Sequence, residues 1–193
     1  MQYRRYAPLI PFPAYAFVPG KHPHPVTDSR GHHFGKSVEI PAELNPLNPT
    51  ASIPFLIGLD LFNAGYYWEA HEAWEGLWIV AGRAGLLASF LKGLIKLAAA
   101  GVKAREGQIS GVQRHARRAI ELFELVSRDP AAHGLVYCGL SLETLLLRTH
   151  HLADHPVIDI TPSILGRRVI SFQLALIGID QFTESIYTTR PIS

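Results

Sequence analysis

Side chains that could do chemistry are concentrated in residues 68–78. One histidine, three glutamates and all three tryptophans of the chain fall within these eleven positions. If the segment is a helix, residues four and seven apart share a face, so His71, Glu75 and Trp78 lie on one stripe with Glu72 on its shoulder. A core helix rarely needs so many ionisable groups beside so much aromatic surface.

The order His71-Glu72-x-x-Glu75 resembles the helical zinc motif His-Glu-x-x-His with a glutamate as the second ligand. A histidine and a glutamate four residues apart can bind one metal ion, which leaves Glu72 as a general base. These three residues are therefore the candidate catalytic group. Two ligands do not hold an ion, so a divalent metal is allowed but not required by the sequence. Candidates for the missing ligands are His24, His32 and His33 near the N-terminus and His115.

Two other interpretations of the same segment stay open. In the simplest, His71 and Glu75 are hydrogen-bonded to each other and to the next helix, and only fix helix packing. In the other, the segment lines a pocket for a ligand such as an anion, although aromatic residues at helical spacing ordinarily belong to the core. The candidate ligand-binding side chains of that pocket are Trp68, Trp78, Lys92 and Lys96.

Helix signals predict an all-α protein, a compact bundle of about five helices in antiparallel pairs over residues 51–155. Ser52 is a plausible N-cap, and Gly65 and Gly107 supply helix stops. Apolar residues recur at helical spacing between these points. The expected helices cover residues 52–62, 66–82, 84–106, 110–127 and 141–151.

The two ends of the chain differ from this bundle. Residues 1–50 hold nine of the fourteen prolines, together with much aromatic surface, and predict an extended arm packed on the body. Residues 156–193 form a C-terminal extension. Its β-forming stretches 157–160 and 169–174 predict a short hairpin or an extended segment packed on the helices.

Composition limits the class of protein. A hydrophobic content of 48%, a charged content of 18% and a net charge of +2 indicate a soluble globular domain without nucleic acid as its obvious partner. The single cysteine, Cys138, excludes an intramolecular disulfide and a zinc site of several thiolates. There is no evident secretory signal, and the apolar stretch 86–102 is interrupted by Lys92 and Lys96 and too short to span a bilayer. We therefore expect a cytoplasmic protein that does not enter a membrane.

The segment Phe62-Asn63-x-Gly65-x-Tyr67-Trp68-Glu69-Ala70-His71-Glu72-x-Trp74-Glu75-x-x-Trp78 resembles the signature of the bacterial and archaeal family catalogued as domain of unknown function 309. A second block agrees, made of residues 90–98, Arg105-Glu106-Gly107 with the residue that follows, and a helix with His115 and Ala119. The Pro/His-rich arm resembles that of longer members. The resemblance implies a small helical bundle but no established activity. In the second block, Lys92 and Lys96 replace the family's usual glutamines and Gln108 replaces its asparagine.

Two classes of function remain. One is a small hydrolase-like or metal-binding enzyme centred on His71, Glu72 and Glu75; the sequence does not decide whether the protein is an enzyme. The other is a helical-hairpin interaction module reminiscent of tetratricopeptide units. Two such hairpins are fewer than a solenoid needs, so this alternative predicts a homo-oligomer or a hairpin pair sealed by the arm.

Overall fold

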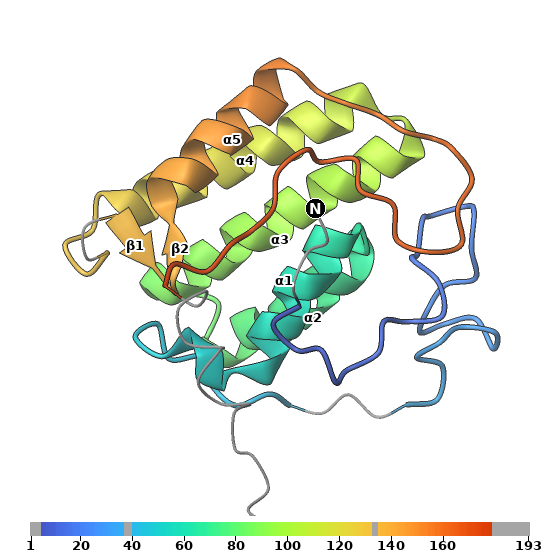
Figure 1. Ribbon diagram of the computed structural model, residues 1–193, viewed down its shortest axis with the longest axis horizontal. Coiled ribbons are helices and arrows are strands. Elements are labelled where there is room, and N and C mark those ends of the chain that lie inside the picture. Colours follow the sequence, from blue (N-terminus) through green and yellow to red (C-terminus); the bar gives the residue numbers. More distant parts are fainter. Residues whose placement is uncertain (1–4, 37–39, 133–134, 179–193) are drawn as a thin grey trace, which may run out of the picture.

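In the computed structural model, which describes residues 5–36, 40–132 and 135–178, five α-helices follow one another and consecutive helices pack together (Figure 1). The protein is mostly helical, as the sequence predicts. The helices are α1 (Ile53–Ala64), α2 (Tyr67–Val80), α3 (Gly85–Glu106), α4 (Ile109–Ser127) and α5 (Leu142–Asp154). A 3₁₀ turn, η1 (Pro49–Ala51), precedes α1, and a two-stranded hairpin, β1 (Val136–Tyr137) and β2 (Leu140–Ser141), precedes α5.

Local capping explains where the helices begin and end. The Ser52 hydroxyl accepts the Phe55 N–H at the start of α1, and the Ser141 hydroxyl caps α5 in the same way. Gly65 and Gly107 end α1 and α3 in the left-handed conformation, with φ of 85° and 81°. Because each is followed at once by a new helix, α1–α2 and α3–α4 are tight hairpins.

The long helix α3 lies between α2 and α4 and forms the centre of the core. Two of its glycines receive aromatic rings from these neighbours. A Cβ atom at Gly93 would lie 2.4 Å from the Phe123 ring of α4, and one at Gly101 would lie 2.4 Å from the Tyr67 ring of α2. The missing side chains therefore set how closely the three helices approach.

By length and composition, α3 is also long and apolar enough to cross a membrane. The sequence-based expectation that this segment is too short is wrong, because the helix continues past the apolar stretch to Glu106 and reaches 22 residues. Within the fold, 61% of its apolar window is buried. One such helix is weak evidence for a membrane span, because the core helix of a globular protein passes the same test.

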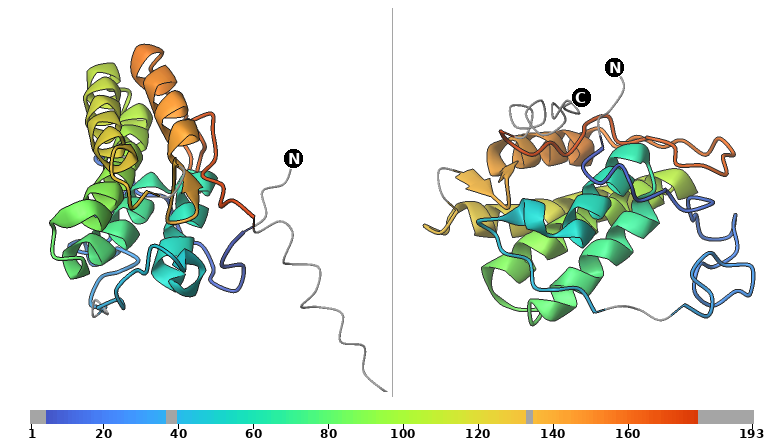
Figure 2. Two further views of the ribbon diagram at one scale, coloured as in Figure 1. Left: turned by 90° about the vertical axis from the view of Figure 1, so that its left-hand side faces the viewer. Right: turned by 60° about the horizontal axis from the view of Figure 1, so that its bottom comes forward.

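The N-terminal arm follows the surface of the bundle without regular secondary structure (Figure 1). Buried carboxylates of α1 and α2 attach it. Asp60 of α1, which is fully buried, accepts the backbone N–H groups of Tyr6 and Ala7, each at 2.8 Å. Glu69 of α2 accepts the N–H of Phe17 at 2.8 Å. At one end of the bundle the arm meets the C-terminal segment, where the Ala16 N–H donates to a carbonyl oxygen of that segment (Figure 2).

The described part of the C-terminal extension, residues 156–178, contains no strand and follows the extended alternative. It pairs with no strand among the described residues: some of its backbone groups bond to helix side chains, and others to single backbone groups, as the Asp159 N–H does to the Ala104 carbonyl. Asn63 donates to the Leu174 carbonyl at 2.9 Å and accepts the Leu174 N–H at 2.7 Å. The Tyr67 hydroxyl accepts the N–H groups of Val169 and Ile170. The remainder of the expected extension, 179–193, lies outside the described residues.

The short β1–β2 hairpin lies where the sequence predicts no strand. Val136 pairs with Ser141 and Tyr137 with Leu140, in antiparallel register. The turn between them uses a positive φ at Cys138 as well as at the following glycine. The Cys138 side chain is buried, and burial raises the pKa of its thiol.

Candidate functional site

Helix α2 presents His71, Glu72 and Glu75 together on a partly exposed face. Their side chains are 27%, 38% and 36% exposed. His71 Nδ1 lies 3.8 Å from Glu72 Oε1, and His71 Nε2 lies 3.8 Å from Glu75 Oε2. These separations exceed hydrogen-bond length. The three groups are therefore close together without being locked to one another.

Burial and neighbouring charges set the protonation of this group. Burial lowers the pKa of His71, and the charges of Lys92 and Lys96 lower it further, while Glu75 opposes them. Burial and the charge of Glu75 raise the pKa of Glu72 to about 7. At neutral pH the imidazole is neutral, the form that binds metal, and Glu72 is poised to take up or release a proton.

The donor set suits a first-row divalent ion. One nitrogen and two carboxylate oxygens, one atom from each residue, all lie within 4.8 Å of one another. Because the ring nitrogens face different carboxylates, an ion held by Nε2 and Glu75 leaves Nδ1 directed at Glu72. An outer carboxylate orients a metal-binding imidazole through a hydrogen bond, and at 3.8 Å Glu72 would have to move closer to do so. Three protein ligands or fewer leave positions open, as in catalytic sites.

The histidines of the arm lie elsewhere on α2. His24 packs edge-on against Trp68, with ring centroids 5.6 Å apart. His32 Nε2 lies 3.9 Å from Glu69 Oε1. Within residues 5–36, 40–132 and 135–178, the group able to hold an ion consists of His71, Glu72 and Glu75 alone. The structure thus does not bring His24 or His32 to the predicted metal ligands.

The tryptophans of α2 have three different surroundings. Trp74 is fully buried, as a core residue should be. Trp68 lies under the arm, edge-on to Phe17 at 5.2 Å. Trp78 is partly exposed, and Lys92 Nζ lies 3.8 Å from the centroid of its ring, in a cation–π contact. The two tryptophans predicted to contact a ligand, Trp68 and Trp78, therefore do not form one continuous aromatic surface. Lys92 contacts Trp78.

Sequence reasoning missed a buried acid beneath the arm. Glu69 is 3% exposed, and burial raises the pKa of its carboxyl group to about 7. Its Oε2 atom and both ring nitrogens of His32 are buried without a hydrogen-bond partner among the described residues. Glu69 precedes His71 by two positions, so helical spacing alone predicts that it lies on another face of α2. Its contact with the arm is not visible in the sequence.

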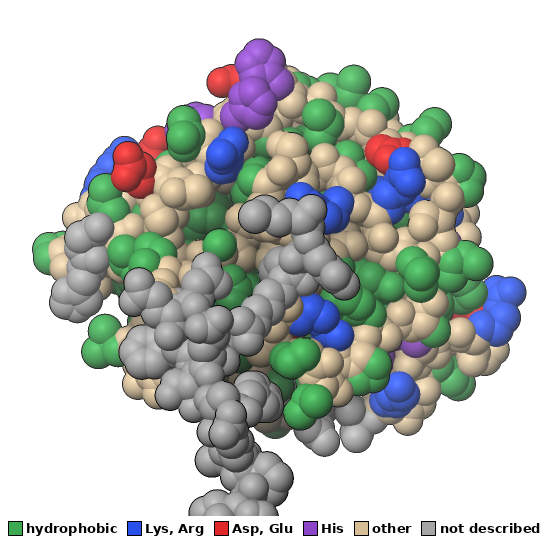
Figure 3. Space-filling view, in the orientation of Figure 1, with side chains coloured by type: hydrophobic (Ala, Val, Ile, Leu, Met, Phe, Trp, Pro, Cys, Tyr) green, Lys and Arg blue, Asp and Glu red, His purple; other side chains and the backbone are tan. Residues whose placement is uncertain are grey.

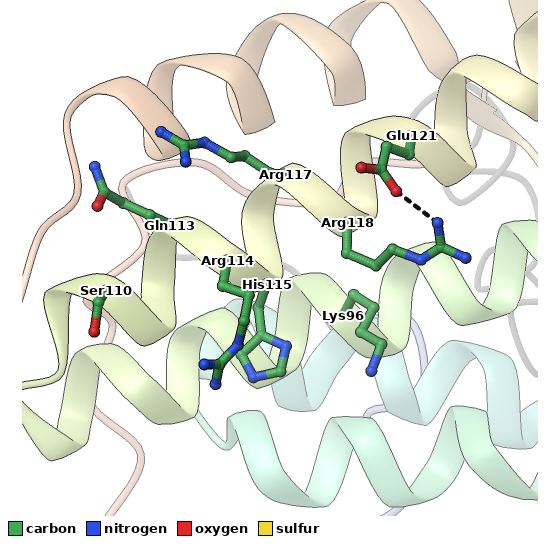
Figure 4. A pocket seen from close by; sticks show the side chains of 8 residues that line it. All are labelled: Lys96, Ser110, Gln113, Arg114, His115, Arg117, Arg118 and Glu121. Atoms are coloured by element: carbon green, nitrogen blue, oxygen red, sulfur yellow. Dashed lines mark hydrogen bonds and ion pairs between the residues drawn. The ribbon is translucent and has the colours of Figure 1, made fainter.

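Lys96 of α3 lies beside α4 and not only beside α2. It lines an open depression of about 570 Å³ together with residues of α4, among them Arg114, His115 and Arg118 (Figure 4). The sequence predicts that these arginines face water, which is correct, but not that they line one depression with Lys96. The only signal in the sequence was charge: residues 92–118 contain seven basic residues and one acidic residue.

The comparisons with known proteins agree with the resemblance noted in the sequence. No curated protein matches the chain. A family model described as Domain of unknown function (DUF309) matches residues 55–115, which run from the start of α1 to the middle of α4 and include His71, Glu72 and Glu75. The chain therefore carries a DUF309 domain over residues 55–115, a family to which no activity is attached.

Proposed function

We propose that the protein binds a divalent metal ion on α2, with His71 and Glu75 as ligands and Glu72 as the adjoining acid–base group. One observation carries the proposal: a nitrogen and two carboxylate oxygens lie within 4.8 Å of one another on side chains that remain partly exposed. A group that only fixed helix packing would be sealed and hydrogen-bonded. No hydrogen bond joins these three side chains in the described part of the chain.

The reaction class that this arrangement supports best is metal-assisted hydrolysis. A bound divalent ion lowers the pKa of water toward neutrality. Glu72, adjacent to His71, would be the base that accepts the proton of that water. His71 would contribute its neutral ring as a ligand.

Metal binding is testable directly. Zn²⁺ and Mn²⁺ are titrated by calorimetry into the chelator-treated, dialysed full-length chain, and the ion content of the purified protein is measured by elemental analysis. We expect one ion per chain, and at least tenfold weaker binding in His71→Ala and in Glu75→Gln. His150→Ala is the matched control, because His150 also lies about 4.0 Å from a glutamate but on the α4–α5 surface. Unchanged binding in His71→Ala, or equal loss in the control, would refute the proposal.

The alternative of a helical-hairpin interaction module has the two glycine-ended hairpins in its favour. Against it, α1 and α2 already hold the chain's own C-terminal segment through Asn63 and Tyr67. A partner on that face would have to displace this segment. Self-association, the absence of nucleic-acid and membrane partners and a cytoplasmic location remain predictions, and sedimentation analysis addresses the first.

A further inference from the structure

A second set of functional groups lies on α3 and α4, outside the acidic face of α2. The depression described above is lined by Lys96 from α3 and by residues of α4 between Ser110 and Glu121. Its basic members outnumber its one acid, Glu121, which pairs with Arg118 at 2.5 Å. On the face drawn in Figure 3, by contrast, acidic and basic side chains are interspersed among apolar ones.

The orientation of the α4 side chains divides them into two groups (Figure 4). Arg114 and His115 extend from α4 toward the side on which Lys96 lies, whereas the guanidinium of Arg118 is directed at Glu121. Gln113 and Arg117 extend the other way, toward α5. The positive charges of Arg114 and Arg118 nevertheless both act on Lys96. Three cationic side chains therefore line the depression together.

This concentration of positive charge lacks a matching set of carboxylates. In the described ranges, neither Lys96 nor Arg114 has a carboxylate within 4.0 Å, whereas Arg118 is paired with Glu121. Burial and the neighbouring cations lower the pKa of Lys96, and the same two causes lower that of His115 to about 4. Like charges held together in this way raise the free energy of the empty site, and a bound anion would remove that cost.

We propose that Lys96, Arg114 and Arg118, with His115 beside them, form a binding site for the phosphoryl group of a small phosphorylated molecule. Arginine presents planar N–H groups that match phosphate oxygens, and lysine adds a point charge. The neutral His115 ring supplies one hydrogen-bond donor without further repulsion. The site uses none of the three α2 residues proposed to hold a metal ion and goes beyond that proposal.

The surroundings favour a compact anion over an extended polyanion. Glu121 flanks the depression on α4, and Glu75 of α2 is close enough for its charge to act on Lys96. A nucleic acid or an anionic bilayer that ran beyond the depression would meet these carboxylates, which repel it. A single phosphoryl group or a diphosphate fits between them.

The test is calorimetric titration of inorganic phosphate and pyrophosphate into the metal-free, dialysed full-length chain at low ionic strength. We expect saturable pyrophosphate binding at one site. Lys96→Gln and Arg114→Gln should each weaken it at least tenfold. Arg117→Gln is the matched control, since it removes the same charge from the same helix and the same depression but points away from Lys96; its effect should stay below twofold.

Several outcomes would overturn the inference. The inference is overturned if pyrophosphate shows no saturable binding up to about 10 mM, because a still weaker affinity would not count as specific. Equal weakening in Arg114→Gln and Arg117→Gln would show diffuse attraction to net charge. The binding of a twelve-nucleotide single strand and of vesicles with anionic lipid is measured in the same way. If either binds more tightly than pyrophosphate and its binding depends on Arg117, the ligand is a polyanion. Binding by His71→Ala at wild-type strength supports an independent site, and its loss there would mean that the anion is held through the α2 group.

Discussion

Replacing Glu69 by glutamine should increase the free energy of unfolding, and this increase should grow as the pH rises. Glu69 is 3% exposed, and its Oε1 atom accepts the Phe17 N–H that ties the arm to α2. The glutamine carbonyl can accept the same bond. What the substitution removes is the ionisation of a carboxyl group that burial, helped by the charge of Glu72, disfavours.

The sign and size follow from the pKa. Burial raises the pKa of Glu69 from 4.5 to about 7. A carboxyl group whose folded pKa is raised contributes stability that is fully present below pH 4.5 and is lost as pH rises through 7. A shift of this size corresponds to about 3 kcal/mol in total, of which roughly 2.5 kcal/mol falls between pH 5 and pH 8.

The assay is urea unfolding of the metal-free protein at four pH values from about 5 to 8, comparing wild type with Glu69→Gln. Other groups titrate in this range, but they do so in both proteins, so the difference between the two curves isolates Glu69. Glu124→Gln is the control, because its side chain is 39% exposed and pairs with Arg128 at the surface. Parallel stability curves for wild type and Glu69→Gln would refute the reasoning, as would a variant that is less stable at pH 8.

Two further predictions concern packing and attachment. Gly101→Ala should destabilise the protein by about 1–3 kcal/mol, because its Cβ would lie 2.4 Å from the Tyr67 ring. Gly76→Ala, whose Cβ meets nothing nearer than 3.6 Å, should instead stabilise α2 by about 0.5–1 kcal/mol, and thermal unfolding of both variants checks the opposite signs. Arg105→Ala should cost about 2–4 kcal/mol and speed proteolysis of residues 156–178, because the buried guanidinium donates to two carbonyl oxygens of that segment. Proteolysis unchanged from wild type would contradict the last prediction.

The helices are predictable from the sequence because their end signals are local. Ser52, Gly65, Gly107 and Ser141 act within one turn of their own positions, and all four function as expected. Where no local stop exists the boundary is less certain: α5 continues to Asp154, beyond its expected end. Local chemistry thus accounts for the order of the helices and for those ends that carry a cap or a glycine stop.

The β segments show what local signals leave out. Strands of two residues are too short to produce a periodic pattern, so β1 and β2 leave no trace. The β-forming residues of the C-terminal extension do carry such a pattern. They find no partner strand in the described fold, and Ile170 and Leu174 use their apolar side chains to pack on the helices instead.

In the candidate site, too, the features set by local helical spacing are predictable and those set by tertiary packing are not. The alignment of His71 with Glu75 is a property of helical spacing and follows from the sequence. Which arm histidine meets which face of α2 depends on the path of a proline-rich segment, and the structure places His32 beside Glu69. That Arg114 and Lys96 line the same depression likewise depends on how α4 is rotated against α3.

The way α1 and α2 hold the C-terminal segment has a consequence for the order of folding. Asn63 and Leu174 are separated by 111 residues, and the Tyr67 contacts span a similar distance. Contacts that close such long loops form late, after the local helical hairpins exist. The bonds from Asn63 and Tyr67 reach backbone groups of the segment and so do not depend on its side chains, whereas the burial of Ile170 and Leu174 does. The hydrogen-bonding groups of Asn63 and Tyr67 are therefore in place on the helices before residues 156–178 dock. Substitutions in this segment should be tolerated at its exposed positions and not at its buried ones.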